Sequence, residues 1–245
     1  MNYTYWKEYF EINRHHFKNI DWDAADSLTG DEKHIITKSI QQFQEGENSE
    51  GKHLFQFAKT LNDDEYLSCI RLFIKEEQSH AKVLGRFMEK YKIEKAKGHW
   101  VDGVFRWLRK LMGLENSIIV LITAEIISKI YYDALRNATG STLLQKICSR
   151  ILQDEDQHIT FQSYTLSVLH ERKSFLSRFI SRSWHLFLMI GTILVVWFYH
   201  KKVFRKGGYY FSRFFLQTML VFLNVDELIK NKNIINRQPL PAVIR

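Results

Sequence analysis

The sequence predicts an all-α protein built on a four-helix bundle, in which a long crossover joins two antiparallel helical hairpins. Three observations lead to this fold class. Apolar residues recur at helical spacing in four long stretches, the pattern Glu-x-x-His occurs in the second and fourth of them, and each pattern lies level with a Glu on the other arm of its hairpin. The 245 residues, 45% hydrophobic with two Pro, suit a helical globular chain. We divide it into an N-terminal amphipathic segment (1–30), the bundle (31–171) and an apolar, basic helical extension (172–245).

The N-terminal segment carries aromatic residues on an amphipathic pattern: Trp6, Phe10, Phe17 and Trp22. Its first 24 residues contain charged side chains and no apolar run, so we expect no secretory signal there.

Four bundle helices are expected near residues 31–61, 64–92, 115–137 and 141–171. Asn62 to Asp64 form the first predicted turn, and Gly140 lies in the second, where Ser141 is a good helix N-cap. The link at 93–114 is long enough for a crossover and includes a predicted short helix, with apolar residues Val104, Trp107, Leu108 and Leu111.

The two motifs pair a carboxylate with an imidazole. Glu77 and His80 lie three residues apart, as do Glu155 and His158, and on a helix such residues share one face. The two motifs are separated by 78 residues at both positions. An oxygen donor beside a nitrogen donor suits a metal ion, and two such pairs with one further Glu from each of two other helices form a di-metal site.

The register of the hairpins selects the two further Glu residues. In an antiparallel hairpin, residues at one level have their sequence midpoint in the turn. Glu50 and Glu77 have their midpoint at 63.5, and Glu125 and Glu155 have theirs at 140.

Both selected residues lie among apolar neighbours. Glu125 stands in an isoleucine-rich stretch, where an unpaired carboxylate is costly. Glu50 lies on the apolar stripe of the first helix; Glu47 shares that stripe and is the alternative, but it makes the hairpin arms less equal.

Other side chains are candidates for positions around the ligands. Glu76 and Asp154 precede the two motif Glu residues, and from opposite helices Asp154 could orient His80 while Glu76 orients His158. The alternative is that both are ordinary solvated charges. Three further candidates, His53, Tyr131 and Tyr132, have competing interpretations: His53 as an extra nitrogen donor or a surface histidine, and the tyrosines as neighbours of the site or as core aromatics.

Together these motifs resemble the ferritin-like di-iron carboxylate superfamily, over roughly residues 30 to 170. The runs Gly46 to Gly51, Phe73 to His80 and Thr123 to Ile127 are more similar to uncharacterised bacterial ferritin-like proteins than to iron-storage ferritins. The resemblance implies two iron ions, or one iron and one manganese, and a reaction with O2 or peroxide that needs an electron donor. It implies as metal ligands Glu50, Glu77, His80, Glu125, Glu155 and His158.

Three functions are compatible with these expectations. The first is an oxidoreductase that oxidises an organic, lipid-like substrate; the second is a ferroxidase or iron-handling protein without an organic substrate; the third is a membrane-associated bundle without catalysis. The two cysteines, Cys69 and Cys148, are far apart and indicate neither a disulfide framework nor the Cys pairs that a rubrerythrin needs. A reducing cytoplasm suits them and ferrous iron.

The C-terminal extension is apolar and basic. The run Trp184–Tyr199 has 16 residues, against about 20 for a membrane span, and a second, amphipathic segment follows from Tyr209 to Leu223 after the hinge Gly207-Gly208. These helices could pack on the bundle or on the partner of a homodimer, form a membrane-associated hairpin over residues 184–223, or cover a channel for a lipid-like substrate. The net charge of +8, with much of its excess after residue 170, favours an anionic membrane surface over nucleic acid.

Overall fold

The computed structural model describes residues 2–48, 51–96 and 113–231. Throughout these ranges the regular elements are helices, and no strand occurs in them. The predicted all-α class is therefore confirmed. The predicted short helix around Val104 and Trp107 lies outside the described residues.

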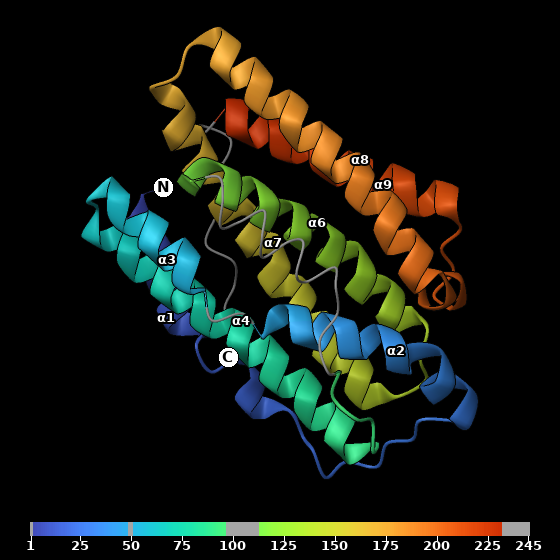
Figure 1. Cartoon of the computed structure of the whole chain (residues 1–245). Helices are drawn as coiled ribbons and strands as arrows, with labels where there is room; N and C mark the ends of the chain where they lie inside the picture. The colour runs from blue at the N-terminus through green and yellow to red at the C-terminus, as the bar shows by residue number, and fades with distance from the viewer. Residues whose placement is uncertain (1, 49–50, 97–112, 232–245) are drawn as a thin grey trace.

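Four helices surround the interior that holds the predicted site: α2 (Gly30–Glu47), α4 (Asp64–Lys90), α6 (Gly113–Asn137) and α7 (Thr142–Glu171). Helix α6 packs along α7, α4 packs against α2 and α7, and the four run side by side in Figure 1. Side-chain caps fix two of their starts, because Asp63 accepts the backbone N–H of Tyr66 and Ser141 accepts that of Leu144.

The first bundle helix is not continuous, so its predicted range of 31–61 is wrong. Helix α2 ends at Glu47, and the short helices α3 (Lys52–Ala58) and η2 (Lys59–Leu61) follow. Gly51 has a left-handed backbone (φ 61°), and a Cβ atom there would lie 2.4 Å from Ile74. Only glycine fits this turn, and the weak helix formers before it favour the break.

The N-terminal segment covers one side of the bundle. Helix α1 (Tyr3–Asn13) and the short helix η1 (His16–Asn19) pack against α4 and α7 respectively. Trp6 and Phe10 are buried in the same hydrophobic cluster as the bundle side chains.

The C-terminal extension forms two long helices, α8 (Phe175–Lys206) and α9 (Phe211–Lys230), which lie on the α6 and α7 side of the bundle (Figure 1). A Cβ atom on Gly207 would lie 2.2 Å from the Ala134 carbonyl oxygen, so glycine permits the turn between them to pack against α6. Within the described ranges, α8 is the one helix that by length and composition could cross a membrane. Its most apolar 18-residue window has a mean hydropathy of 1.6, and one third of that window is buried inside the protein.

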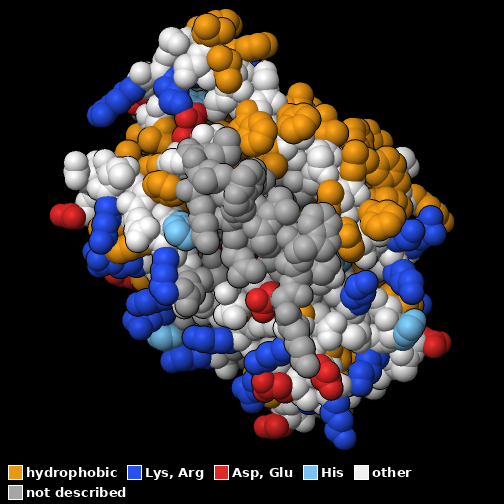
Figure 2. Space-filling view, viewed as in Figure 1, with side chains coloured by type: hydrophobic (Ala, Val, Ile, Leu, Met, Phe, Trp, Pro, Cys, Tyr) orange, Lys and Arg blue, Asp and Glu red, His pale blue; other side chains and the backbone are white. Residues whose placement is uncertain are grey.

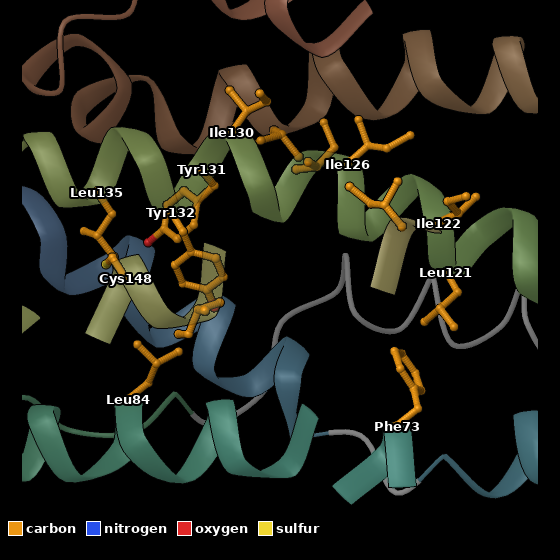
Figure 3. Packing of buried hydrophobic residues seen from close by; sticks show 14 of the residues in the cluster. Phe73, Leu84, Leu121, Ile122, Ile126, Ile130, Tyr131, Tyr132, Leu135 and Cys148 are labelled. Atoms are coloured by element: carbon orange, nitrogen blue, oxygen red, sulfur yellow. The ribbon is translucent and has the colours of Figure 1, made fainter. Parts of the chain in front are cut away.

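The core is continuous from the bundle into the extension. In Figure 3, Leu121 of α6 and Phe73 of α4 point toward each other, whereas Ile126 and Ile130 lie on the side of α6 that faces α8 and α9. Helix α6 is therefore packed on both sides, which explains why its sequence is apolar nearly all round. All three predicted segments contribute to one hydrophobic cluster.

Candidate metal centre

Six buried or nearly buried side chains converge between α2, α4, α6 and α7. They form two overlapping groups, each with donor atoms within 4.8 Å of one another. One group is Glu47, Glu77, His80 and Glu155; the other is Glu77, Glu125, Glu155 and His158. Each group therefore has its own Glu and its own His, and both share Glu77 and Glu155. Either group could hold a metal ion.

Helix geometry places these donors. Glu77 and His80 lie one turn apart on α4, Glu155 and His158 do the same on α7, and Glu125 projects from the middle of α6. The predicted pairing of the two motifs across the bundle is present, since the ring centroids of the two His are 5.6 Å apart.

The donor atoms have the spacing of ligands around an ion. His80 Nδ1 lies 3.7 Å from Glu47 Oε2 and 3.9 Å from Glu155 Oε1. His158 Nδ1 lies 3.0 Å from Glu77 Oε1 and 3.5 Å from Glu125 Oε2. Two ligand atoms at about 2.1 Å from a shared ion are about 3.0–3.5 Å apart at octahedral or tetrahedral angles, so the observed spacing needs little adjustment.

Most of these atoms have no well-aligned hydrogen-bond partner among the described residues. Unpartnered buried atoms include Nδ1 of His80 and of His158, Oε1 of Glu77, and both carboxylate oxygens of Glu155. Buried polar atoms are rarely left without a partner, because each one costs free energy. Bound cations in the two overlapping groups would explain why these atoms gather together.

The carboxylates lack a positive partner of the usual kind. Within the described parts of the chain, no Lys or Arg forms an ion pair with Glu47, Glu77, Glu125 or Glu155. Burial, together with the charges of Glu125 and Glu47, raises the pKa of Glu77 to about 8. Burial and the adjacent Glu125 carboxylate raise the pKa of Glu155 well above its ordinary value. Glu77 and Glu155 therefore oppose ionisation unless cations enter the site.

Both histidines are oriented by carboxylates behind them. His80 Nε2 lies 3.0 Å from Asp154 Oδ2, and His158 Nε2 lies 2.8 Å from Glu76 Oε2. These are the pairings expected from the sequence, so Glu76 and Asp154 are not solvated charges. When each Nε2–H donates to its carboxylate, each Nδ1 keeps a free lone pair directed at the Glu cluster.

Loss of the carboxylate behind His80 should weaken metal binding without removing a ligand. We expect Asp154→Ala to lower metal affinity about 10- to 100-fold, the range typical of such partners, because the His80 ring loses its fixed tautomer and orientation. Isothermal titration with Mn²⁺ measures this effect. Asp156→Ala is the matched control, since Asp156 lies on the same helix but pairs with Lys129 at the surface. Equal affinities for the two variants would contradict the assigned role of Asp154.

The N-terminal segment ties the two carboxylates together, a feature that the sequence analysis missed. Asn13 Nδ2 donates to Glu76 Oε1 and to Asp154 Oδ1, both at 2.7 Å. His16 Nδ1 lies 3.0 Å from Asp154 Oδ1. Asn13 lies three residues after buried Phe10 and therefore on the same face of α1. The amphipathic pattern of this segment could have predicted that Asn13 faces the bundle.

On the first bundle helix the structure brings Glu47 into the cluster. The preferred residue, Glu50, lies outside the described residues. The register argument assumed one continuous helix, whereas α2 ends at Glu47, so counting residues through the break loses its basis. Because Glu47 is a member of the cluster, we expect Glu47→Ala to weaken metal binding.

Of the three remaining candidate residues, one lies next to the site and two do not. Tyr132 is buried and its hydroxyl donates to Glu47 Oε1 at 2.6 Å, so it lies next to the site. Tyr131 stacks on Phe43 with ring centroids 3.4 Å apart, as a core aromatic. His53 is exposed on α3.

Aromatic rings cover the histidines. Phe73 and Phe10 have ring centroids 4.7 and 6.1 Å from that of His158, and the Phe17 centroid is 5.6 Å from that of His80. These rings give the polar cluster an apolar surround, and the N-terminal segment supplies two of them.

Comparison with known proteins adds no assignment. No protein-family model matches the chain, and no curated protein shows a significant match to it.

Proposed function

We propose that this protein is a di-metal carboxylate protein of the ferritin-like class and acts as an oxidoreductase. The observation that carries the proposal is the set of unpartnered donor atoms gathered in two overlapping buried groups. Four carboxylates carry four negative charges when ionised, and two divalent cations balance them while both histidines stay neutral. Glu47 and His80 would hold one ion and Glu125 and His158 the other, with Glu77 and Glu155 belonging to both donor groups.

Iron, or iron with manganese, suits this donor set. Carboxylates with one imidazole per ion are the ligands of di-iron and di-manganese sites in helical bundles. A pair of such ions supplies redox chemistry with O2 or peroxide, given an external electron donor. The chain's own contribution is to hold the donors in place, to fix the histidine tautomers through Glu76 and Asp154, and to exclude water with Phe10, Phe17 and Phe73.

The aromatic rings around the site suit an organic substrate better than the passage of iron ions. Entry of free iron is favoured by an approach lined with Asp and Glu, whereas the rings beside His80 and His158 are aromatic. We therefore place oxidation of an apolar, lipid-like substrate ahead of a ferroxidase function. We also propose a cytoplasmic location, because the two cysteines are free and buried.

Stepwise oxidation of added iron distinguishes an oxidase of an organic substrate from a ferroxidase. Ferrous iron is added anaerobically, beyond two ions per chain, and oxygen is then admitted while its consumption is measured. We expect oxidation to stop after about two ions per chain and to resume only when a reductant is supplied. Oxidation that continues through the excess iron without a reductant would favour the ferroxidase. Oxygen consumption equal to that of Glu155→Ala would contradict both functions.

A further inference from the structure

Helices α8 and α9 present a wide exposed apolar face. Figure 2 shows hydrophobic side chains gathered over these two helices, along the upper right edge of the view. Phe187 and Phe198 of α8 are 71% and 68% exposed, whereas most large apolar side chains of the bundle are buried. The other exposed members are Phe175, Leu176, Phe179, Ile180, Leu186, Ile190, Leu194, Tyr210, Phe211, Leu216, Leu220 and Leu223.

The opposite face of α8 is fixed to the bundle. His200 Nδ1 lies 2.7 Å from Ser39 Oγ of α2, and Met189, Ile193 and Phe204 are fully buried. Because α8 packs along α6 and α2, a spanning orientation would carry these helices and their charged side chains into the hydrocarbon. The packing therefore supports a helix that lies along a surface, with one side on the protein and the other outside.

The length of the apolar face agrees with this orientation. From Phe175 to Phe198 it covers 24 residues, or about 36 Å at 1.5 Å per residue. This length is typical of amphipathic helices that lie in the interface of a membrane, and α9 lies alongside α8.

Positive charge surrounds the face. Residues 175–225 contain no Asp or Glu. Five basic side chains lie near the turn between α8 and α9, and all are exposed: Lys201, Lys202, Arg205, Lys206 and Arg213. At the other end of the hairpin, Arg182 and Lys230 share Asp226 as their ion-pair partner, and Arg178 is exposed.

We infer that the α8–α9 face binds the surface of an anionic lipid bilayer, with both helices parallel to the membrane plane. Apolar side chains enter the acyl boundary while the basic residues at the turn contact the headgroups. A second copy of this chain is the competing occupant. A two-fold pairing that brings the two turns together would place their basic residues side by side. In the opposite direction the turn would meet an end where Asp226 is already paired with Arg182 and Lys230, so an anionic surface complements the face better than a second copy does. The inference does not depend on the metal proposal.

Binding to lipid vesicles tests the inference. The full chain, purified without detergent, is mixed with vesicles of phosphatidylcholine alone or with phosphatidylglycerol added, and the bound fraction is measured by co-sedimentation. We expect binding to be at least about tenfold tighter with phosphatidylglycerol, since each basic residue near an anionic surface adds to the attraction, and to weaken as salt is raised.

Paired variants locate the surface. Phe187→Gln/Phe198→Gln should weaken vesicle binding at least about tenfold, whereas Ile12→Gln, at an exposed apolar position on α1, should not. Lys201→Gln/Lys202→Gln should weaken binding to anionic vesicles about tenfold, and the control Lys82→Gln on α4 should not.

Three outcomes would overturn the inference. The first is wild-type binding to anionic vesicles that is absent or no tighter than binding to neutral ones. The second is a dimer in sedimentation velocity that Phe187→Gln/Phe198→Gln dissociates, because a second copy would then cover the face. The third is a chain that leaves cell membranes only with detergent, as a spanning α8 would require.

Discussion

Replacement of Glu155 by alanine is expected to abolish the binding of both metal ions, because the carboxylate belongs to both donor groups. Glu77→Ala should have the same effect for the same reason. Glu47→Ala removes a donor from one group only, so it should leave the other ion bound and give about one ion per chain. Metal content by mass spectrometry after dialysis measures all three.

The comparison has matched controls. Glu45→Ala lies two residues before Glu47 on α2 and outside both groups, and it should retain both ions. Circular dichroism verifies that each variant is helical. If Glu155→Ala kept one ion while Glu47→Ala lost both, the assignment of shared and separate carboxylates would be wrong.

Metal binding should stabilise the fold by a large amount. An ion at a free concentration of about 1,000 times its Kd contributes about 4 kcal/mol, so two ions contribute about 8 kcal/mol. For a chain of this size each kcal/mol shifts Tm by about 2–4 °C, which predicts a rise of about 15–30 °C when metal is added. Differential scanning calorimetry, with and without Mn²⁺ under identical buffer conditions, measures the rise.

The same experiment on a ligand variant identifies the source of that stability. Glu155→Ala should lose the rise almost completely, and the metal-free variant should be no less stable than the metal-free wild type, since it removes a buried carboxylate whose pKa is raised by burial and by Glu125. An equal rise in Tm for variant and wild type would mean that the metal binds elsewhere.

The sequence predicted the fold well where local signals were strong. Asp63 and Ser141 cap the helices that start next to them, and the apolar periodicity of the four stretches corresponds to α2, α4, α6 and α7. The caps and the periodicity are signals from residues a few positions apart, which a sequence shows directly. The pairing of His80 with Asp154, one of two alternatives at the level of the sequence, is present in the structure.

Other features depended on contacts between distant segments. The break after Glu47 depends on the left-handed Gly51 beside Ile74, and it removes the basis for choosing between Glu47 and Glu50 by counting residues along one continuous helix. The role of Asn13 depends on how α1 is docked, which no spacing within the bundle reveals. One-sided packing of α8 likewise appears only when the bundle beneath it is present.

Metal content per chain tests the central claim most directly. The wild-type protein is reconstituted anaerobically with ferrous iron, dialysed, and analysed for iron and protein concentration. The charge balance of the four carboxylates and the two overlapping donor groups predict about two iron ions per chain. The absence of stoichiometric metal, with iron and with manganese alike, would contradict the account and leave the unpartnered atoms of Glu155 and the two histidines without an explanation.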